Sequence, residues 1–162
     1  MSTIVFIGFR GSGKTTLGRW LAGELGMEFI DTDALVLDRL GYDSVELAWD
    51  AIGEDGWREA ESKVIPPLLR KDAVISFGGG APTIPLIKKA LSSVPIVFNL
   101  ITDAEETARR ITSGVDRPVL SKSNDEVRSD RLPLYSMLGT CAINTSGPIE
   151  ESQLQILDFL QN

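Results

Sequence analysis

Short apolar runs alternate along the chain with segments in which apolar residues recur at helical spacing. The apolar runs predict buried strands at 4–7, 27–30, 73–77, 95–101 and 141–144. The helical spacing predicts helices at 14–25, 35–40, 44–51, 57–69, 85–91, 103–111, 126–138 and 149–160. Pro66 and Pro67 are expected to break or kink the fourth of these helices. Strands that alternate with helices indicate an α/β fold, in which helices cover both faces of a parallel sheet.

Polar residues mark the starts of several predicted elements. Ser44 and Asp103 precede apolar helical patterns and are expected to be N-caps.

The polar stretch 113–124 is expected to be the most mobile segment. Arg110 and Arg117 accompany this stretch, where charged residues are commonly just solvated loop.

A glycine-rich loop follows the first predicted strand. Residues 8–15 read Gly-Phe-Arg-Gly-Ser-Gly-Lys-Thr and match the pattern GxxxxGK[ST]. In such a loop the backbone N–H groups converge on phosphate, Lys14 adds a positive charge, and the hydroxyl of Thr15 can reach Mg²⁺. The alternative is an ordinary strand–turn–helix junction. The position between an apolar strand and an amphipathic helix favours a nucleotide-binding loop.

Composition narrows the possible functions. The 162 residues are 43% hydrophobic, which is enough for one domain with its own core, and the net charge of −7 disfavours binding to nucleic acid or to a membrane surface. The chain has no histidine, and Cys141 alone cannot form an intramolecular disulfide. No apolar run approaches the roughly 20 residues of a membrane span, and no targeting pattern begins the chain. We therefore expect a cytoplasmic protein. We also expect the protein to be a monomer, an expectation that does not follow from composition.

The ends of the next two strands also carry unusual residues. Asp31 and Asp33 end the second strand, and Gly78, Gly79 and Gly80 end the third. In open parallel sheets the ligand site lies beyond these strand ends. Two carboxylates beside a phosphate loop can hold the waters of Mg²⁺ or take a proton from a hydroxyl. Alternatively, one of them caps the following helix.

Two arginines are candidates for binding an anionic ligand. Arg58 lies three residues before Glu61, whose carboxylate can orient the guanidinium. Such a pair is commonly solvated on a protein surface. Arg131 precedes Tyr135 at a similar spacing, and the alternative is again a surface arginine, beside a half-buried ring. Neither arginine would indicate a function without the phosphate loop.

The order of these motifs resembles that of the shikimate kinase family, and the resemblance covers nearly the whole chain. Six segments carry it: the loop at 8–15, FIDTD at 29–33, WREAE at 57–61, ISFGGG at 75–80, RPVL at 117–120 and RLPLY at 131–135. The resemblance implies a P-loop three-layer sandwich of the nucleoside monophosphate kinase type with a five-stranded parallel sheet. A substrate-binding region at about 31–61 and a lid at about 112–124 would belong to one domain, 1–162.

The resemblance also implies a reaction: ATP phosphorylates the 3-hydroxyl of shikimate, giving shikimate 3-phosphate and ADP, in chorismate and aromatic amino acid biosynthesis. Lys14 would hold β- and γ-phosphate oxygens, Asp33 would orient or deprotonate the hydroxyl, and Arg117 would stabilise charge in the transition state. Thr15 and, through water, Asp31 would position Mg²⁺.

Binding residues follow from the same resemblance. The ATP site would consist of Gly11, Ser12, Gly13, Lys14, Thr15, Thr16, Arg110, Arg117 and Pro148, with Arg110 and Pro148 enclosing adenine. The shikimate site would consist of Asp33, Arg58, Gly78, Gly79, Gly80 and Arg131, with the two arginines on the carboxylate. Arg10 departs from the family pattern, which often has a neutral residue there, and so could alter nucleotide affinity. Asp116 beside Arg117 could weaken lid closure.

Two other functions compete with this reading. A kinase of the same fold could act on gluconate or a nucleoside monophosphate, but Asp33, Arg58 and Arg131 together favour a substrate with a carboxylate and a hydroxyl. A regulatory module could bind nucleotide without turnover. The presence of Lys14, Asp33 and Arg117 disfavours such a module.

Overall fold

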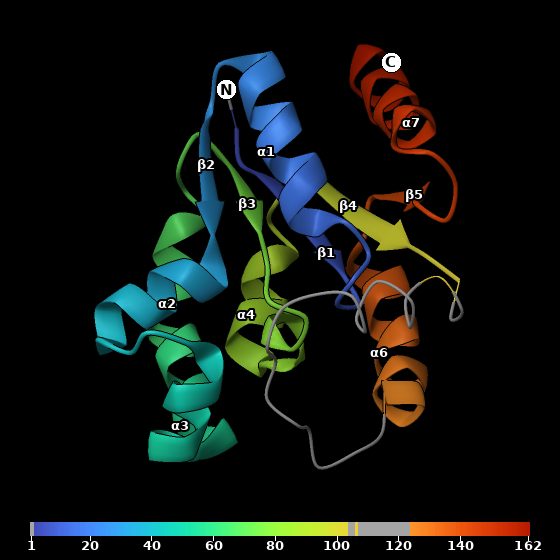
Figure 1. Ribbon diagram of the computed structural model, residues 1–162. Helices are drawn as coiled ribbons and strands as arrows, with labels where there is room; N and C mark the ends of the chain where they lie inside the picture. Colours follow the sequence, from blue (N-terminus) through green and yellow to red (C-terminus); the bar gives the residue numbers. More distant parts are fainter. Residues whose placement is uncertain (1, 104–105, 107–123) are drawn as a thin grey trace.

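A computed structural model describes residues 2–103, 106 and 124–162 of the chain (Figure 1). Its centre is one five-stranded sheet in the order β2-β3-β1-β4-β5. The strands are β1 (Ile4–Gly8), β2 (Glu28–Asp31), β3 (Ala73–Ser76), β4 (Ile96–Ile101) and β5 (Cys141–Asn144). All neighbouring strands pair in parallel, which confirms the predicted α/β sheet.

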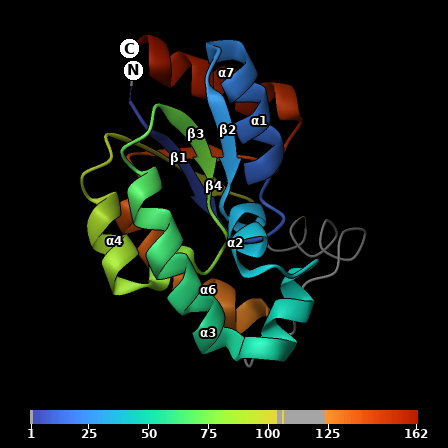
Figure 2. The ribbon, with the colours of Figure 1, turned by 90° about the vertical axis from the view of Figure 1, so that its left-hand side faces the viewer.

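Helices cover both faces of this sheet (Figures 1 and 2). They are α1 (Lys14–Leu25), α2 (Thr32–Leu40), α3 (Val45–Leu68), α4 (Pro85–Leu91), α6 (Asn124–Leu138) and α7 (Ile149–Gln161), with a short 3₁₀ helix η1 (Ala81–Thr83). No helix among the residues given above is both long and apolar enough to span a membrane.

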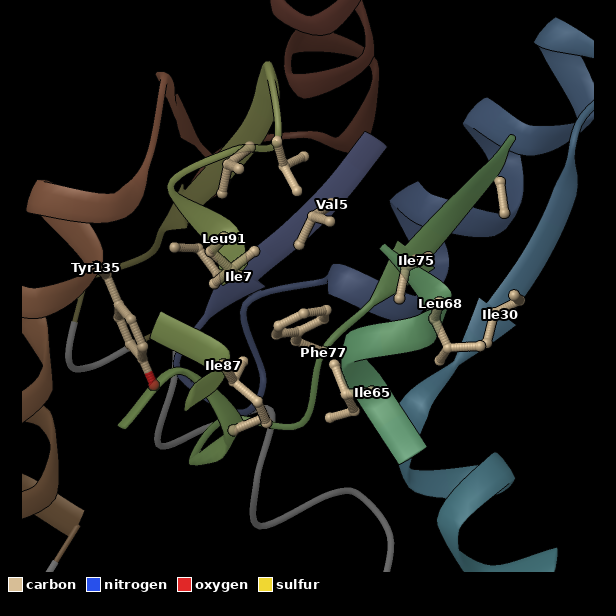
Figure 3. Packing of buried hydrophobic residues seen from close by; sticks show 14 of the residues in the cluster. Val5, Ile7, Ile30, Ile65, Leu68, Ile75, Phe77, Ile87, Leu91 and Tyr135 are labelled. Carbon is tan, nitrogen blue, oxygen red and sulfur yellow. The ribbon is translucent and has the colours of Figure 1, made fainter. Parts of the chain in front are cut away.

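The central strand β1 explains why the apolar runs are continuous rather than alternating. All five of its residues are buried. Val5 and Ile7 join the cluster that includes residues of α3, α4 and α6, shown in Figure 3, whereas Ile4 and Phe6 join the cluster with α1 and α7. Because side chains alternate between the two faces and both faces are covered, every position is apolar.

The predicted break at Pro66 and Pro67 is wrong. Helix α3 continues through both prolines and ends at Leu68. Each proline lacks a backbone donor and crowds the carbonyl four residues earlier, at positions 62 and 63, but α3 keeps helical backbone angles there. The interruption lies instead at Gly53 (φ 72°, ψ 176°), between the two helices predicted at 44–51 and 57–69. Glycine accepts this left-handed φ, which other residues avoid.

Two predicted helix caps are confirmed by hydrogen bonds. Ser44 Oγ accepts from the Leu47 N–H at 3.1 Å, and Asp103 Oδ1 accepts from the Glu106 N–H at 2.7 Å. The rest of the helix predicted at 103–111 lies outside the described residues. So do 112–123 of the predicted lid, and with them Arg117.

Candidate active site

The loop between β1 and α1 borders a cavity, here called the phosphate-loop cavity. Its lining comprises Arg10, Gly11, Gly13, Lys14, Thr15, Thr16, Asp31, Asp33, Ser76, Phe77, Gly78 and Gly79. Lys14 is buried, and its Nζ donates to the carbonyl oxygens of Gly8 (2.8 Å) and Phe9 (3.1 Å). Because the positive end of the α1 dipole and an ammonium group meet here, the cavity is suited to phosphate.

Thr145 fastens this loop to the end of the edge strand β5, a role that the sequence did not reveal. Its hydroxyl donates to the backbone carbonyl of Ser12 at 2.8 Å and is hydrogen-bonded to the hydroxyl of Thr102. Thr102 and Thr145 directly follow β4 and β5. Their positions after two parallel strands were the available signal, but threonine is too common at strand ends to single them out.

The two aspartates of the second strand end have different local roles. Asp31 caps α2, because its Oδ1 accepts from the N–H groups of Asp33 (2.9 Å) and Ala34 (3.4 Å). The helix-cap alternative is therefore confirmed for Asp31, although its carboxylate also lines the phosphate-loop cavity. Asp33 lies in the first turn of α2, with its carboxylate against Gly78, where a Cβ would collide with Oδ1.

A second cavity adjoins the first, and three arginines of the described part of the chain line it. This arginine cavity is lined by Arg10, Asp33, Val45, Trp49, Trp57, Arg58, Gly78, Gly79, Gly80 and Arg131. It shares residues with the phosphate-loop cavity, and one of them is Asp33. A site for one anion therefore lies directly beside a site for phosphate.

Arg58 is held in this cavity by a buried carboxylate. Its Nη1 donates to Glu61 Oε1 at 2.6 Å, and its guanidinium lies 5.6 Å from the ring centroid of Trp49. Glu61 is fully buried, so the surface-pair alternative is wrong for this pair. A Cβ on Gly80 would collide with the guanidinium of Arg58, which shows why the turn after β3 has no side chain there.

Arg131 reaches the same glycine turn from α6. A Cβ on Gly79 would lie 3.3 Å from Arg131 Nη1. Tyr135, one turn further along α6, is 1% exposed and donates its hydroxyl to the carbonyl of Gly79. Burial raises the pKa of this phenol, while the neighbouring Arg131 opposes the rise. The ring is therefore buried rather than half-buried, and it fixes α6 and Arg131 against the turn.

The comparisons with known proteins agree with this geometry. A family model described as shikimate kinase matches residues 10–161. A shikimate kinase of Halorhodospira halophila is 36% identical over 152 residues, which cover 90% of this chain and 85% of that protein. The chain belongs to the shikimate kinase family. The shikimate kinase resemblance seen in the sequence is thereby confirmed.

Solved structures place the fold within the same family. A shikimate kinase from Acinetobacter baumannii in complex with shikimate superposes with a TM-score of 0.88 at 31% identity, covering 99% of this chain and 92% of that one. A gluconokinase from Sinorhizobium meliloti reaches a TM-score of 0.59 at 18% identity, covering 99% and 94%. The similarity to the gluconokinase shows a shared fold and does not indicate the substrate of this chain.

A third cavity also borders the phosphate loop. It is lined by Ser12, Gly13, Thr16, Leu17, Thr145, Gly147, Ile149 and Ser152. Pro148, predicted to contact adenine, stands between two lining residues at the start of α7. Its proposed partner Arg110 lies outside the residues that the structure describes.

Glu61 gives this shikimate kinase family member a pH-dependent stability. Burial, the largest cause, raises the pKa of Glu61 from 4.5 to about 7, although Arg58 opposes the rise. The folded chain therefore binds this proton more tightly than the unfolded chain. The stabilisation is complete below pH 4.5 and is lost as the pH rises through about 7.

We expect Glu61→Gln to remove this dependence. Between pH 4.5 and 8, the free energy of unfolding of the wild type should fall by up to about 3 kcal/mol relative to that of the variant. Urea unfolding of both proteins at several pH values measures the difference. A difference that stays constant with pH would show that folding does not raise the pKa of Glu61.

Proposed function

We propose that this chain transfers the γ-phosphoryl group of ATP to the 3-hydroxyl of shikimate, giving shikimate 3-phosphate and ADP in aromatic amino acid biosynthesis. The observation that carries the proposal is the meeting of the two cavities at Asp33. One cavity suits a triphosphate, and the other suits a small carboxylate. A hydroxyl bound beside Asp33 therefore lies next to the terminal phosphate.

The reaction needs one bond formed and one bond broken. The 3-oxygen of shikimate bonds to the γ-phosphorus while the bond from that phosphorus to the β–γ bridging oxygen breaks, and ADP leaves. Asp33 accepts a hydrogen bond from the hydroxyl, orients it, and can take its proton. Lys14 and the loop N–H groups bind the phosphate oxygens, where they offset negative charge.

The residues present fit Mg²⁺ beside the nucleotide. The hydroxyl of Thr15 and the carboxylate of Asp31 line the same cavity, and Mg²⁺ prefers such oxygen ligands. Thr15 would hold the ion directly and Asp31 through water, with one Asp31 oxygen already used in the helix cap. When bound, Mg²⁺ supplies positive charge to the phosphate oxygens.

On the shikimate side, Arg58 and Arg131 would hold the carboxylate. A guanidinium suits this task because its parallel N–H groups match the two carboxylate oxygens. Trp49 and Trp57 supply apolar walls to the same cavity. The backbone groups of Gly78, Gly79 and Gly80 would contact the ring hydroxyls.

Several parts of the proposal rest on the family resemblance alone. Arg117 would stabilise the transferred phosphoryl group from a lid at 112–124, and Arg110 with Pro148 would enclose adenine. The whole chain, 1–162, would act as one domain with a substrate-binding region at 31–61. We also propose that the protein is a cytoplasmic monomer.

A coupled assay of ADP release tests the proposed reaction. With ATP and Mg²⁺ present, we expect turnover with shikimate and none above background with gluconate or nucleoside monophosphates. Turnover with gluconate alone would favour the kinase alternative. ATP binding without any turnover would favour a regulatory module.

The close contact between Gly80 and Arg58 gives a further prediction. In Gly80→Ala, the added methyl group would displace the Arg58 guanidinium, so we expect the KM for shikimate to rise about tenfold and the KM for ATP to change less than about twofold. Steady-state kinetics measures both constants. Gly23→Ala is the control, since a Cβ there meets no atom within 4 Å. An unchanged KM for shikimate in Gly80→Ala would mean that the Arg58 guanidinium moves aside for the methyl group and still binds shikimate as well.

A further inference from the structure

We propose that Arg10 is a further catalytic residue, which contacts the transferred phosphoryl group and then the 3-phosphate of the product. The inference rests on the proposed reaction and adds a residue to it. Its basis is the place of Arg10 between the two cavities.

Among the residues that the structure describes, four line both the phosphate-loop cavity and the arginine cavity: Arg10, Asp33, Gly78 and Gly79. Two of the four are glycines and present only backbone. The side chains at the junction are therefore one carboxylate, from Asp33, and one guanidinium, from Arg10. The carboxylate suits the attacking hydroxyl, and the guanidinium suits the group that the hydroxyl attacks.

The position of Arg10 is fixed by the phosphate loop. Its backbone nitrogen would lie 3.9 Å from a Cβ placed on Gly79, so the loop passes close to the glycine turn. Its Nε is buried although the side chain as a whole is partly exposed. The bond from Thr145 to Ser12 holds the same loop against the end of β5. The backbone from Arg10 to Ser12 thus lies between the glycine turn and the end of β5.

The three arginines of the arginine cavity divide into two groups. Arg58 and Arg131 line the arginine cavity but not the phosphate-loop cavity, whereas Arg10 lines both. Arg58 and Arg131 are therefore placed for the shikimate carboxylate, which takes no part in the bond changes of the proposed reaction. Arg10 is placed for the phosphoryl group, which passes from one cavity to the other.

This placement predicts contact on both sides of the transfer. The γ-phosphorus leaves the bridging oxygen of ADP and bonds to the 3-oxygen of shikimate, while its three outer oxygens stay negatively charged. A guanidinium at the junction can donate to these oxygens before and after the transfer. Shikimate lacks them, so Arg10 should distinguish the product from the substrate.

Calorimetric titration of Arg10→Met tests this directly. We expect its Kd for shikimate 3-phosphate to rise about ten- to hundredfold and its Kd for shikimate to change less than about threefold, because only the product carries a phosphate for Arg10 to bind. The kcat should fall by a similar factor. Arg70→Met is the control: Arg70 is exposed and lines neither cavity, so both Kd values should stay at those of the wild type.

Three results would overturn the role of Arg10. An equal rise in the Kd values for shikimate and for shikimate 3-phosphate would mean that Arg10 binds the carboxylate, which both molecules share. Weaker ADP binding with unchanged product binding would assign it to the nucleotide. Unchanged affinities for shikimate, shikimate 3-phosphate and ADP would mean that Arg10 binds none of the three. If Arg10→Met does not fold, Arg10→Gln is judged by the same ratio of product to substrate affinity.

Wild-type turnover, measured first, separates this inference from the proposed function. Turnover with shikimate together with an unchanged affinity ratio in Arg10→Met refutes the role of Arg10 alone. A wild type that does not phosphorylate shikimate refutes both.

Discussion

Replacing Asp33 with asparagine is expected to lower kcat by about 10²- to 10⁴-fold and to leave the Kd for ATP within about threefold of the wild type. The amide has the shape of the carboxylate but lacks its charge and cannot take a proton from the shikimate hydroxyl. ATP binds through the phosphate loop, which the substitution does not alter. Steady-state ADP release gives kcat, and titration with ATP gives the Kd.

Asp38→Asn is the matched control for this experiment. Asp38 lies on the same helix α2, but it is exposed and lines neither cavity. We expect kcat and the Kd for ATP in this variant to equal those of the wild type. Near-normal turnover in Asp33→Asn would remove Asp33 from the mechanism.

Replacing Arg58 with alanine is expected to raise the KM for shikimate by about 10²-fold and the KM for ATP by less than about threefold. A carboxylate that loses one of two guanidinium partners binds far more weakly, whereas Arg58 does not line the phosphate-loop cavity. Steady-state kinetics with each substrate varied in turn measures both constants.

The same substitution also leaves the buried carboxylate of Glu61 without the guanidinium that it accepts from. Thermal unfolding therefore accompanies the kinetics. The double variant Arg58→Ala with Glu61→Gln should recover stability but not shikimate affinity, because only the buried charge is relieved. Arg39→Ala, exposed at the end of α2, is the control. Equal rises in both KM values would mean that Arg58 supports the fold rather than binds shikimate.

Local chemistry made much of the fold predictable. Helix α1 and strand β5 have the predicted bounds, because a glycine loop or turn residues mark their ends. The apolar runs identified the strands, since both faces of the sheet are covered. The order of motifs along the chain identified the family, because strand ends in a parallel sheet gather at one edge.

Features that depend on tertiary packing were not predictable. A pair at i and i+3 looks the same on a surface and in a core, so Glu61 gave no sign of its burial. Pro66 and Pro67 indicated a break, but α3 continues through both of them to Leu68. The interruption at Gly53, by contrast, falls in the gap between the helices predicted at 44–51 and 57–69.

Contacts between segments far apart in the chain could not be predicted from the sequence either. The bond from Thr145 to Ser12 joins the ends of β5 and β1 across β4, and neither residue type suggests it. Arg10 could be recognised as a charge in the phosphate loop. Its place in a second cavity depends on how Gly79 and α6 pack beside the loop.

A crystal structure of the protein with ADP and shikimate tests the proposed direct transfer most directly. We expect the shikimate carboxylate on Arg58 and Arg131, and its 3-hydroxyl within hydrogen-bond distance of Asp33 and on the side facing the β-phosphate of ADP. A shikimate molecule bound outside the arginine cavity, or with its 3-hydroxyl turned away from Asp33, would contradict transfer between the two adjoining cavities.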